Sequence, residues 1–306
     1  MKVLICDPVD DKALAKMKDA GLDVTVKTGM SPEELLETAP GFDAMVVRSA
    51  TKVRKPVIEK SKGSLKVIVR GGVGIDNIDH EYAQSLGIEV RNTPSASSAS
   101  VAELALAHIF AQLRYISRGT CGMKQAKWEK KQLKGQEIAG KTLAVIGLGR
   151  IGTELAKKSA ALGMKVKGFK RSKIDKPPVE GMEIYYDLDE AIKDADIVSL
   201  HLPCTEQTKN IFNKETLMKL KKGCILINCA RGGIVDEQAL AEVIKEGHIS
   251  GAGFDVYADE PVKEDNPLLK LDNITLTPHI GASTKEAQAR VGQEVADILI
   301  EYSKNL

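Results

Sequence analysis

Short apolar runs rich in β-branched residues alternate with longer amphipathic stretches along most of the chain. In the first half these runs predict strands at residues 3–6, 24–27, 44–48, 67–70 and 89–92, with helices between them. A second series begins at Thr142 and continues with predicted strands at residues 165–169, 197–202, 224–228, 251–255 and 274–277. Such alternation of strands and helices is typical of parallel sheets that are covered by helices.

A polar segment of small residues, 92–100, separates the two series, and residues 101 to about 118 then predict one long helix. The last predicted helix, from about 283 to 304, lies beyond the second series and can pack back onto the first. We therefore expect an α/β fold with two Rossmann-like or flavodoxin-like parallel-sheet domains and an active-site cleft between them. The first, discontinuous domain would comprise residues 1–98 and 283–306, and the second residues 99–282.

Composition argues against several classes of function. The 44 basic residues nearly balance 42 acidic ones, so no global field favours nucleic acid or an anionic membrane as a partner. The five cysteines lack CxxC spacing, so neither a disulfide framework nor a metal site is expected. The chain enters its first predicted strand without a signal sequence, and no uncharged apolar run approaches the length of a membrane span. A cytoplasmic location is expected.

The most informative motif lies where the strand that begins at Thr142 runs into a glycine-patterned turn and then a helix. Gly147 permits a tight turn, Gly149 lets the backbone approach a pyrophosphate, and Gly152 allows close packing of helix and strand. The pyrophosphate would sit on the amides and positive dipole end of the helix. This context favours a dinucleotide-binding site over an ordinary glycine-rich connection.

A second glycine turn, at residues 69–77, carries Asn77 in the third glycine position and fails the dinucleotide pattern. It is interpreted instead as a nest of backbone amides that could hold a carboxylate, with a plain strand-to-helix turn as the alternative. Arg48 and Ser49 end one strand and Arg70 ends the next, at the edge where open parallel sheets bind ligands. Two arginines there indicate a doubly charged or phosphorylated substrate, although either alone could be a surface charge.

Three polar residues follow successive strands of the second series: Arg231, Glu260 and His279. Hydride transfer from a secondary alcohol needs a base for the hydroxyl proton and a fixed cation that orients the acid, and His279 and Arg231 would supply these roles. Glu260, if hydrogen-bonded to the imidazole, would favour imidazolium. Taken singly, the histidine could be structural and the glutamate a solvated loop charge. Their joint placement favours an active site.

These motifs together resemble the D-isomer-specific 2-hydroxyacid dehydrogenases over essentially the whole chain. The resemblance is carried by residues 47–53, 70–79, 123–130, 147–152, 228–237 and 278–288. It implies that Arg231, Glu260 and His279 are catalytic, that Arg48 and Ser49 hold a phosphate, and that amides around Val73 hold the substrate carboxylate. The substrate-binding residues would be Arg48, Ser49, Arg70, Gly71, Gly72, Val73 and Gly74.

The same resemblance implies a nicotinamide cofactor, with Asp255 and the Ala230 carbonyl fixing its carboxamide and Leu202 and Pro203 lining the adenine pocket. The implied cofactor-binding residues are Val73, Gly147, Gly149, Arg150, Ile151, Gly152, Lys170, Arg171, Leu202, Pro203, Cys229, Ala230, Asp255, Gly281 and Ala282. Proteins of this kind pair through the nucleotide-binding domain. A homodimer or a dimer of dimers is therefore expected, with residues 128–131 reaching towards the partner's active site.

Within the family, the resemblance is greatest to members that oxidise 3-phosphoglycerate at C2 to 3-phosphohydroxypyruvate, the entry step of serine synthesis. A glyoxylate or hydroxypyruvate reductase is the nearest alternative, and a non-catalytic, dinucleotide-sensing corepressor on the same fold is another. Retention of Arg231, Glu260 and His279 does not decide against the corepressor, since a sensor can keep these residues.

Two departures from the family pattern matter. Lys170 and Arg171 follow the second strand of the nucleotide domain, where relatives usually carry an aspartate that bonds the ribose hydroxyls. A basic pair could bind a ribose 2′-phosphate, so NADP(H) is expected beside NAD(H), unless Lys170 is a surface residue indifferent to both. The chain ends at Leu306, so the C-terminal regulatory domain of longer relatives is expected to be absent.

Overall fold

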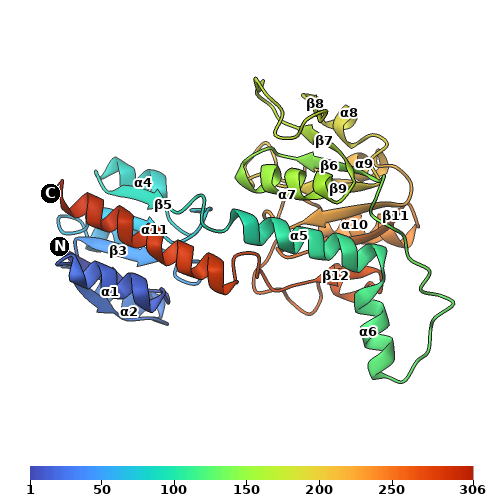
Figure 1. Cartoon of the computed structure of the whole chain (residues 1–306). Coiled ribbons are helices and arrows are strands. Elements are labelled where there is room, and N and C mark those ends of the chain that lie inside the picture. Colours follow the sequence, from blue (N-terminus) through green and yellow to red (C-terminus); the bar gives the residue numbers. More distant parts are fainter. Residues whose placement is uncertain (306) are drawn as a thin grey trace. The chain divides into compact units, whose positions relative to one another are not determined.

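The computed structural model describes residues 1–305, which form two compact units (Figure 1). The first unit comprises Met1–Ser98 and the segment from Ala282 onward, and the second comprises Ala99–Gly281. The sequence boundary placed Ala282 in the second domain. The structure places it in the first unit, where its carbonyl accepts a hydrogen bond from Gln288 Nε2 at 2.7 Å.

The first unit is built on a five-stranded sheet in the order β2-β1-β3-β4-β5, the flavodoxin-like order, with all strand pairs parallel. Its central strand, Ala44–Val47, is a fully buried apolar run, because helices cover both faces. The strands are β1 (Lys2–Ile5), β2 (Asp23–Val26), β3 (Ala44–Val47), β4 (Val67–Arg70) and β5 (Glu89–Asn92).

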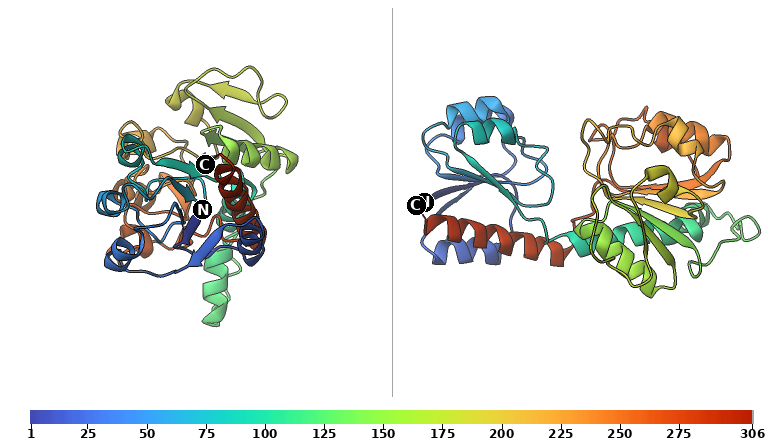
Figure 2. Two further views of the ribbon diagram at one scale, coloured as in Figure 1. Left: turned by 90° about the vertical axis from the view of Figure 1, so that its left-hand side faces the viewer. Right: turned by 90° about the horizontal axis from the view of Figure 1, so that it is seen from above.

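Two apolar clusters, one on each face, stabilise this sheet. Helices α1 (Asp11–Asp19) and α11 (Lys285–Ser303) pack together on one face, so the last helix joins the first unit (Figure 2). The other face is covered by α2 (Pro32–Thr38), α3 (Lys55–Lys60) and α4 (His80–Ser85). Thr284 caps α11 by accepting the Ala287 amide.

The second unit is built on a seven-stranded parallel sheet in the order β12-β11-β10-β9-β6-β7-β8. The order reverses at β6, which is the switch point where dinucleotides bind in Rossmann-type sheets. The strands are β6 (Thr142–Ile146), β7 (Lys165–Phe169), β8 (Glu183–Tyr185), β9 (Ile197–Leu200), β10 (Cys224–Asn228), β11 (Ile249–Phe254) and β12 (Ile274–Leu276). The expected α/β class with two parallel-sheet domains is confirmed.

Helices also cover both faces of the second sheet. One apolar cluster joins it to α5 (Ser98–Leu113) and α7 (Arg150–Ala161). The other joins it to α8 (Leu188–Ile192), α9 (Lys214–Met218), α10 (Glu237–Lys245) and the 3₁₀ helix η1 (Pro267–Lys270). Helix α6 (Ile116–Lys124) extends away from this sheet (Figure 1).

The single helix predicted from residue 101 to about 118 is wrong, because the structure divides it. Helix α5 ends at Leu113, Tyr115 adopts φ 53°, and α6 begins at Ile116. The free carbonyl of Leu113 accepts the Gln136 amide from a returning segment at 2.9 Å. That long-range bond terminates α5, and no local residue pattern marks it.

Within residues 1–305, no helix is both long and apolar enough to cross a membrane. Nor do the described histidine, cysteine, aspartate and glutamate side chains form a group that could hold a metal ion.

Candidate active site

Neighbouring strands β10, β11 and β12 bring three predicted residues to one edge of the second sheet. Arg231, Glu260 and His279 lie in the loops that follow these strands. His279 Nδ1 is hydrogen-bonded to Glu260 Oε2 at 2.6 Å, and both side chains are about one third exposed, at 39% and 35%. The imidazole therefore has one nitrogen tied to a carboxylate and the other available for a proton.

The environment of Glu260 favours its ionised form. Burial alone would raise the pKa of Glu260, but hydrogen bonds from His279 and from the Tyr257 amide, at 3.0 Å, outweigh it. The charges of His279 and Arg231 act in the same direction, so the pKa of Glu260 lies below its ordinary value. The carboxylate thus stays charged beside the imidazole.

The position of Arg231 depends on a residue that the sequence analysis missed. Asn228, buried at the end of β10, donates through Nδ2 to the Arg231 carbonyl at 2.9 Å and accepts the Ala230 amide at 3.1 Å. A Cβ on Gly232 would lie 1.7 Å from the Tyr257 carbonyl oxygen, so only glycine lets this loop approach the Glu260 loop. The sequence signal that could have identified Asn228 is an asparagine at the end of an apolar strand.

Asp255 is buried and accepts hydrogen bonds from the loop that carries His279. Its Oδ1 accepts the Thr277 hydroxyl at 2.6 Å and the Ile280 amide at 2.8 Å, and its Oδ2 accepts the Gly281 amide at 2.8 Å. His279 adopts φ 52°, a left-handed conformation that non-glycine residues keep only where neighbouring contacts enforce it. The carboxylate therefore fixes the loop; its contact with a nicotinamide carboxamide stays a prediction.

The glycine fingerprint at the end of β6 has the geometry that a dinucleotide requires. Gly147 has φ 108°, and a Cβ there would lie 2.5 Å from the His201 carbonyl oxygen. A Cβ on Gly152 would lie 2.0 Å from the Gly147 carbonyl oxygen, so α7 packs directly on the turn. Gly149 is the N-cap of α7 and provides no side-chain cap, which leaves the first-turn amides of Arg150 and Ile151 for an anion.

Open space surrounds Gly149, since no described atom lies within 4 Å of a Cβ built there, and its backbone angles suit alanine. If the pyrophosphate occupies that space, Gly149→Ala should weaken NAD(H) binding about tenfold or more without lowering the melting temperature. Calorimetric titration of the folded variant measures this. Unchanged affinity would mean that the pyrophosphate lies elsewhere.

The other predicted cofactor residues lie in the same unit, apart from Val73 and Ala282. Leu202 and Pro203 follow β9, and a Cβ on Gly147 would lie 3.1 Å from Leu202 Cδ2. Lys170, half-buried, and Arg171, exposed, follow β7. Cys229, Ala230 and Gly281 are buried and belong to the loops that carry Arg231 and His279.

The predicted phosphate residues cluster in the first unit. Arg70 Nη2 donates to Ser49 Oγ at 3.0 Å, and Arg48 Nη1 donates to Gln288 Oε1 on α11. A Cβ on Gly71 would lie 3.0 Å from Val291 of α11 and 3.4 Å from Arg48 Cγ, and one on Gly72 would collide with the Arg70 guanidinium. The two guanidinium groups therefore gather at the carboxyl ends of β3 and β4.

The amides of Gly72, Val73 and Gly74 donate to no backbone acceptor within the described residues, so they remain available to an anion.

The family follows from comparison with known proteins. Residues 106–281 match the model described as the D-isomer specific 2-hydroxyacid dehydrogenase, NAD binding domain. The chain belongs to the D-isomer specific 2-hydroxyacid dehydrogenase family. The matched residues cover most of the second unit, including the C-terminal half of α5, the glycine fingerprint, Arg231, Glu260 and His279.

Two curated relatives of this dehydrogenase carry different names. It is 48% identical over 299 residues to a D-3-phosphoglycerate dehydrogenase of Methanocaldococcus jannaschii, which covers 97% of this chain but 56% of that protein. It is 47% identical over 300 residues to a hydroxypyruvate reductase of Thermotoga maritima, which covers 97% of this chain and 96% of that protein. The chain thus spans about half the length of the first relative, at 56%, and nearly all of the second.

A solved structure agrees with the fold of this dehydrogenase. An acyclic imino acid reductase in complex with NADPH and D-Arg superposes with a TM-score of 0.90 at 30% identity. The match covers 100% of this chain and 98% of that chain.

The loop that carries Arg48 is held by residues that sequence analysis did not assign to the dehydrogenase site. Asn77 Nδ2 donates to the carbonyls of Arg48 and Thr51 at 2.6 and 2.7 Å. Asp7, buried in the segment just after β1, accepts the Arg48 amide at 2.5 Å. Asn77 therefore replaces the third glycine of a dinucleotide motif for a structural reason: its side chain clamps the neighbouring loop.

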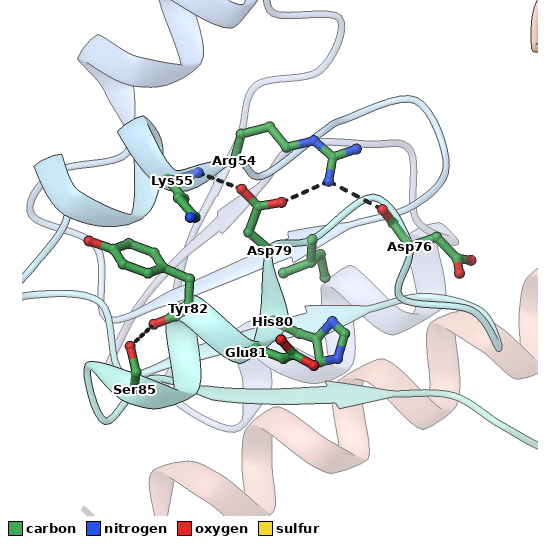
Figure 3. A pocket seen from close by; sticks show the side chains of 9 residues that line it. Arg54, Lys55, Asp76, Asp79, His80, Glu81, Tyr82 and Ser85 are labelled. Carbon is green, nitrogen blue, oxygen red and sulfur yellow. Dashed lines mark hydrogen bonds and ion pairs between the residues drawn. The ribbon is translucent and has the colours of Figure 1, made fainter. Parts of the chain in front are cut away.

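A pocket of about 610 Å³ also opens in the first unit of the dehydrogenase (Figure 3). Two of its cations have partners in the lining: Arg54 Nη1 lies 3.0 Å from Asp79 Oδ1, and Lys55 Nζ lies over the Tyr82 ring. None of the predicted substrate residues lines it. We therefore assign it no part in the reaction.

Proposed function

We propose that the protein oxidises the C2 hydroxyl of a phosphorylated D-2-hydroxy acid, 3-phosphoglycerate, and passes the hydride to NAD(P), giving 3-phosphohydroxypyruvate. This is the entry step of serine synthesis. The observation that carries the proposal is the 2.6 Å hydrogen bond between His279 and Glu260, beside Arg231, at the edge of a dinucleotide-binding sheet.

The proton moves through His279. With Nδ1–H donated to Glu260, the lone pair of Nε2 accepts the hydroxyl proton while the hydride leaves C2. The Glu260 carboxylate then stabilises the imidazolium. Arg231 orients the substrate carboxylate and polarises the carbonyl that forms. When bound, the nicotinamide ring supplies the acceptor for the hydride.

The first unit would hold the anionic ends of the substrate. Arg48, Ser49 and Arg70 form a fork suited to a phosphate, and the amides of Gly72 to Gly74 suit a carboxylate.

The cofactor would rest on the first turn of α7 at Gly149, with its adenine near Leu202 and Pro203.

Reduction of hydroxypyruvate or glyoxylate is the second candidate, favoured by the match to the Thermotoga reductase over 96% of that protein's length. Steady-state assays separate the candidates when 3-phosphoglycerate, phosphohydroxypyruvate, hydroxypyruvate and glyoxylate are each tested with both cofactors. The proposal predicts the highest kcat/KM for the phosphorylated pair. Preference for an unphosphorylated acid indicates the reductase, and cofactor binding without any turnover indicates a sensor.

Cofactor choice should depend on Lys170, at the end of β7, where a carboxylate would accept the ribose 2′-hydroxyl. Lys170→Asp adds that acceptor and repels a 2′-phosphate. Loss of one charge-assisted bond costs about 1.5–3 kcal/mol, so the kcat/KM ratio of NAD(H) to NADP(H) should rise roughly tenfold, or up to a hundredfold if Arg171 contributes little. Lys173→Asp, nearby in the same basic run, is the control. An unmoved ratio in Lys170→Asp means that the side chain faces solvent.

We further propose that the protein is a homodimer or a dimer of dimers. Helix α6 and the residues after it expose large apolar side chains: Ile116, Met123 and Trp128, the last at 78%. Such a group on an extension is suited to burial against a second copy. Sedimentation of the wild type and of Trp128→Ala tests this assignment.

A further inference from the structure

Helix α5 packs on β11 through two polar side chains that two glycines admit. A Cβ on Gly253 would lie 2.6 Å from His108 Cβ, and one on Gly251 would lie 2.4 Å from Gln112 Oε1. His108 and Gln112 are one helical turn apart and therefore face the sheet together. An apolar pair would suffice for packing, so the polar pair calls for another explanation.

His108 is buried and connects two threonines of the β12 strand and the loop after it. Its Nδ1 lies 2.7 Å from Thr275 Oγ1, and its Nε2 lies 3.1 Å from Thr277 Oγ1. Burial lowers the pKa of His108, and the nearby Asp255 opposes this only in part. The imidazole is therefore neutral near pH 7, with one donor nitrogen and one acceptor nitrogen.

The hydrogen-bond partners decide which nitrogen carries the proton. The Asp255 carboxylate can only accept, so the Thr277 hydroxyl donates its proton to Oδ1 at 2.6 Å. Thr277 Oγ1 must then accept from His108, which places the proton on Nε2. Nδ1 consequently accepts from the Thr275 hydroxyl. The chain of bonds has one direction, from Thr275 through His108 and Thr277 to Asp255.

This chain of hydrogen bonds ends on the loop that carries His279. The Asp255 carboxylate accepts the amides of Ile280 and Gly281, and the Asp255 carbonyl accepts the His279 amide at 2.8 Å. Helix α5 contacts the loop a second time, because the buried Ser100 hydroxyl donates to the Gly281 carbonyl at 2.6 Å. These bonds hold His279 at its positive φ.

We propose that His108 is a positioning residue for His279, acting through the Thr277 hydroxyl and the Asp255 carboxylate. The inference rests on the proposed function, since it concerns the orientation of the same acid–base group. A loop freed from this chain would sample other conformations, and the Nε2 atom of His279 would meet the substrate hydroxyl less often. Small misplacements of a reacting group lower the rate of the chemical step while leaving ground-state binding nearly intact.

Three substitutions at one position separate the two threonine contacts. In His108→Gln the side-chain amide reaches the Nε2 position and can donate to Thr277, whereas in His108→Asn it reaches only the Nδ1 position beside Thr275. His108→Phe removes both contacts while keeping a ring of similar size. Thr275→Val removes the upstream hydroxyl and leaves the Thr277 link, so it is the matched control.

We expect kcat to fall about tenfold in His108→Phe and His108→Asn, with KM within about twofold of the wild type. His108→Gln and Thr275→Val should stay within about twofold in kcat. Melting temperatures identify a variant that fails to fold. If His108→Phe fails to fold, the comparison of His108→Gln with His108→Asn is the test. Equal kcat for the glutamine and asparagine variants would overturn the proposal.

A second readout does not need activity. Hydrogen exchange of the Ile280 and Gly281 amides, which bond to Asp255, should accelerate about tenfold in His108→Asn and not in His108→Gln. If the wild type turns over none of the four acids, the proposed function fails, and this exchange still tests the positioning. Equal protection in both variants would overturn it.

Discussion

Replacing His279 by alanine is expected to lower kcat by on the order of a hundredfold or more and to leave NAD(H) affinity nearly unchanged. The alanine variant keeps the fingerprint at Gly147 to Gly152 but loses the group that accepts the hydroxyl proton. Glu260 cannot replace it, because its carboxylate lies 2.6 Å from Nδ1 of the ring and not at the Nε2 position that meets the substrate hydroxyl. Steady-state rates with 3-phosphoglycerate, and fluorescence titration of NADH, measure the two effects.

His80→Ala is the matched control, since His80 lines the pocket of the first unit and takes no part in the proposed reaction. It should retain the wild-type rate. Near-normal turnover of His279→Ala would exclude the histidine as the acid–base group and leave the role of Glu260 without support.

Arg48→Ala should raise KM for phosphohydroxypyruvate roughly ten- to a hundredfold and change KM for hydroxypyruvate by much less. The range follows from about 1.5–3 kcal/mol for each hydrogen bond between a charged donor and an anion. Arg48 is suited to this contact because its guanidinium is partly buried and positioned by Gln288, so little entropy is lost on binding. Initial rates over a range of concentrations of each acid give the two KM values.

Arg54→Ala provides the comparison, because Arg54 follows the same strand but pairs with Asp79. It should leave both KM values nearly unchanged. If Arg48→Ala raises KM equally for the two acids, the phosphate is held by other residues.

The parallel sheets are predictable because buried strands leave near-continuous apolar runs. Predicted strands 67–70 and 224–228, which are mostly buried and apolar, coincide with β4 and β10, and predicted strands 89–92 and 165–169 also coincide with β5 and β7. Edge strand β8 (Glu183–Tyr185) is missed, since it has three residues, none of them buried, and shows no apolar run. The end of α5 is missed because a distant segment sets it.

The convergence of Arg231, Glu260 and His279 is also predictable, because neighbouring parallel strands end at the same edge. The residues that hold Arg48 and its loop are not predictable in this way. Gln288 is 240 residues from Arg48, and Asp7 and Asn77 are 41 and 29 residues away. Only tertiary packing brings such polar residues to one loop, so each appeared in the sequence as an ordinary surface or turn residue.

The tautomer of His108 is likewise determined by tertiary packing and could not be predicted from the sequence. It follows from a chain of donors and acceptors that ends at Asp255, 147 positions further along the sequence, and no local pattern around His108 indicates it. A lone histidine on an apolar helix would ordinarily be interpreted as packing alone.

The ratio of kcat/KM for phosphohydroxypyruvate to kcat/KM for hydroxypyruvate, measured on the wild type with its preferred reduced cofactor, tests the central claim most directly. One charge-assisted contact to the phosphate is worth about 1.5–3 kcal/mol, so the account predicts a ratio of at least roughly ten. A ratio near or below unity would show that the arginine cluster does not select a phosphate and would identify the enzyme as a reductase of unphosphorylated acids.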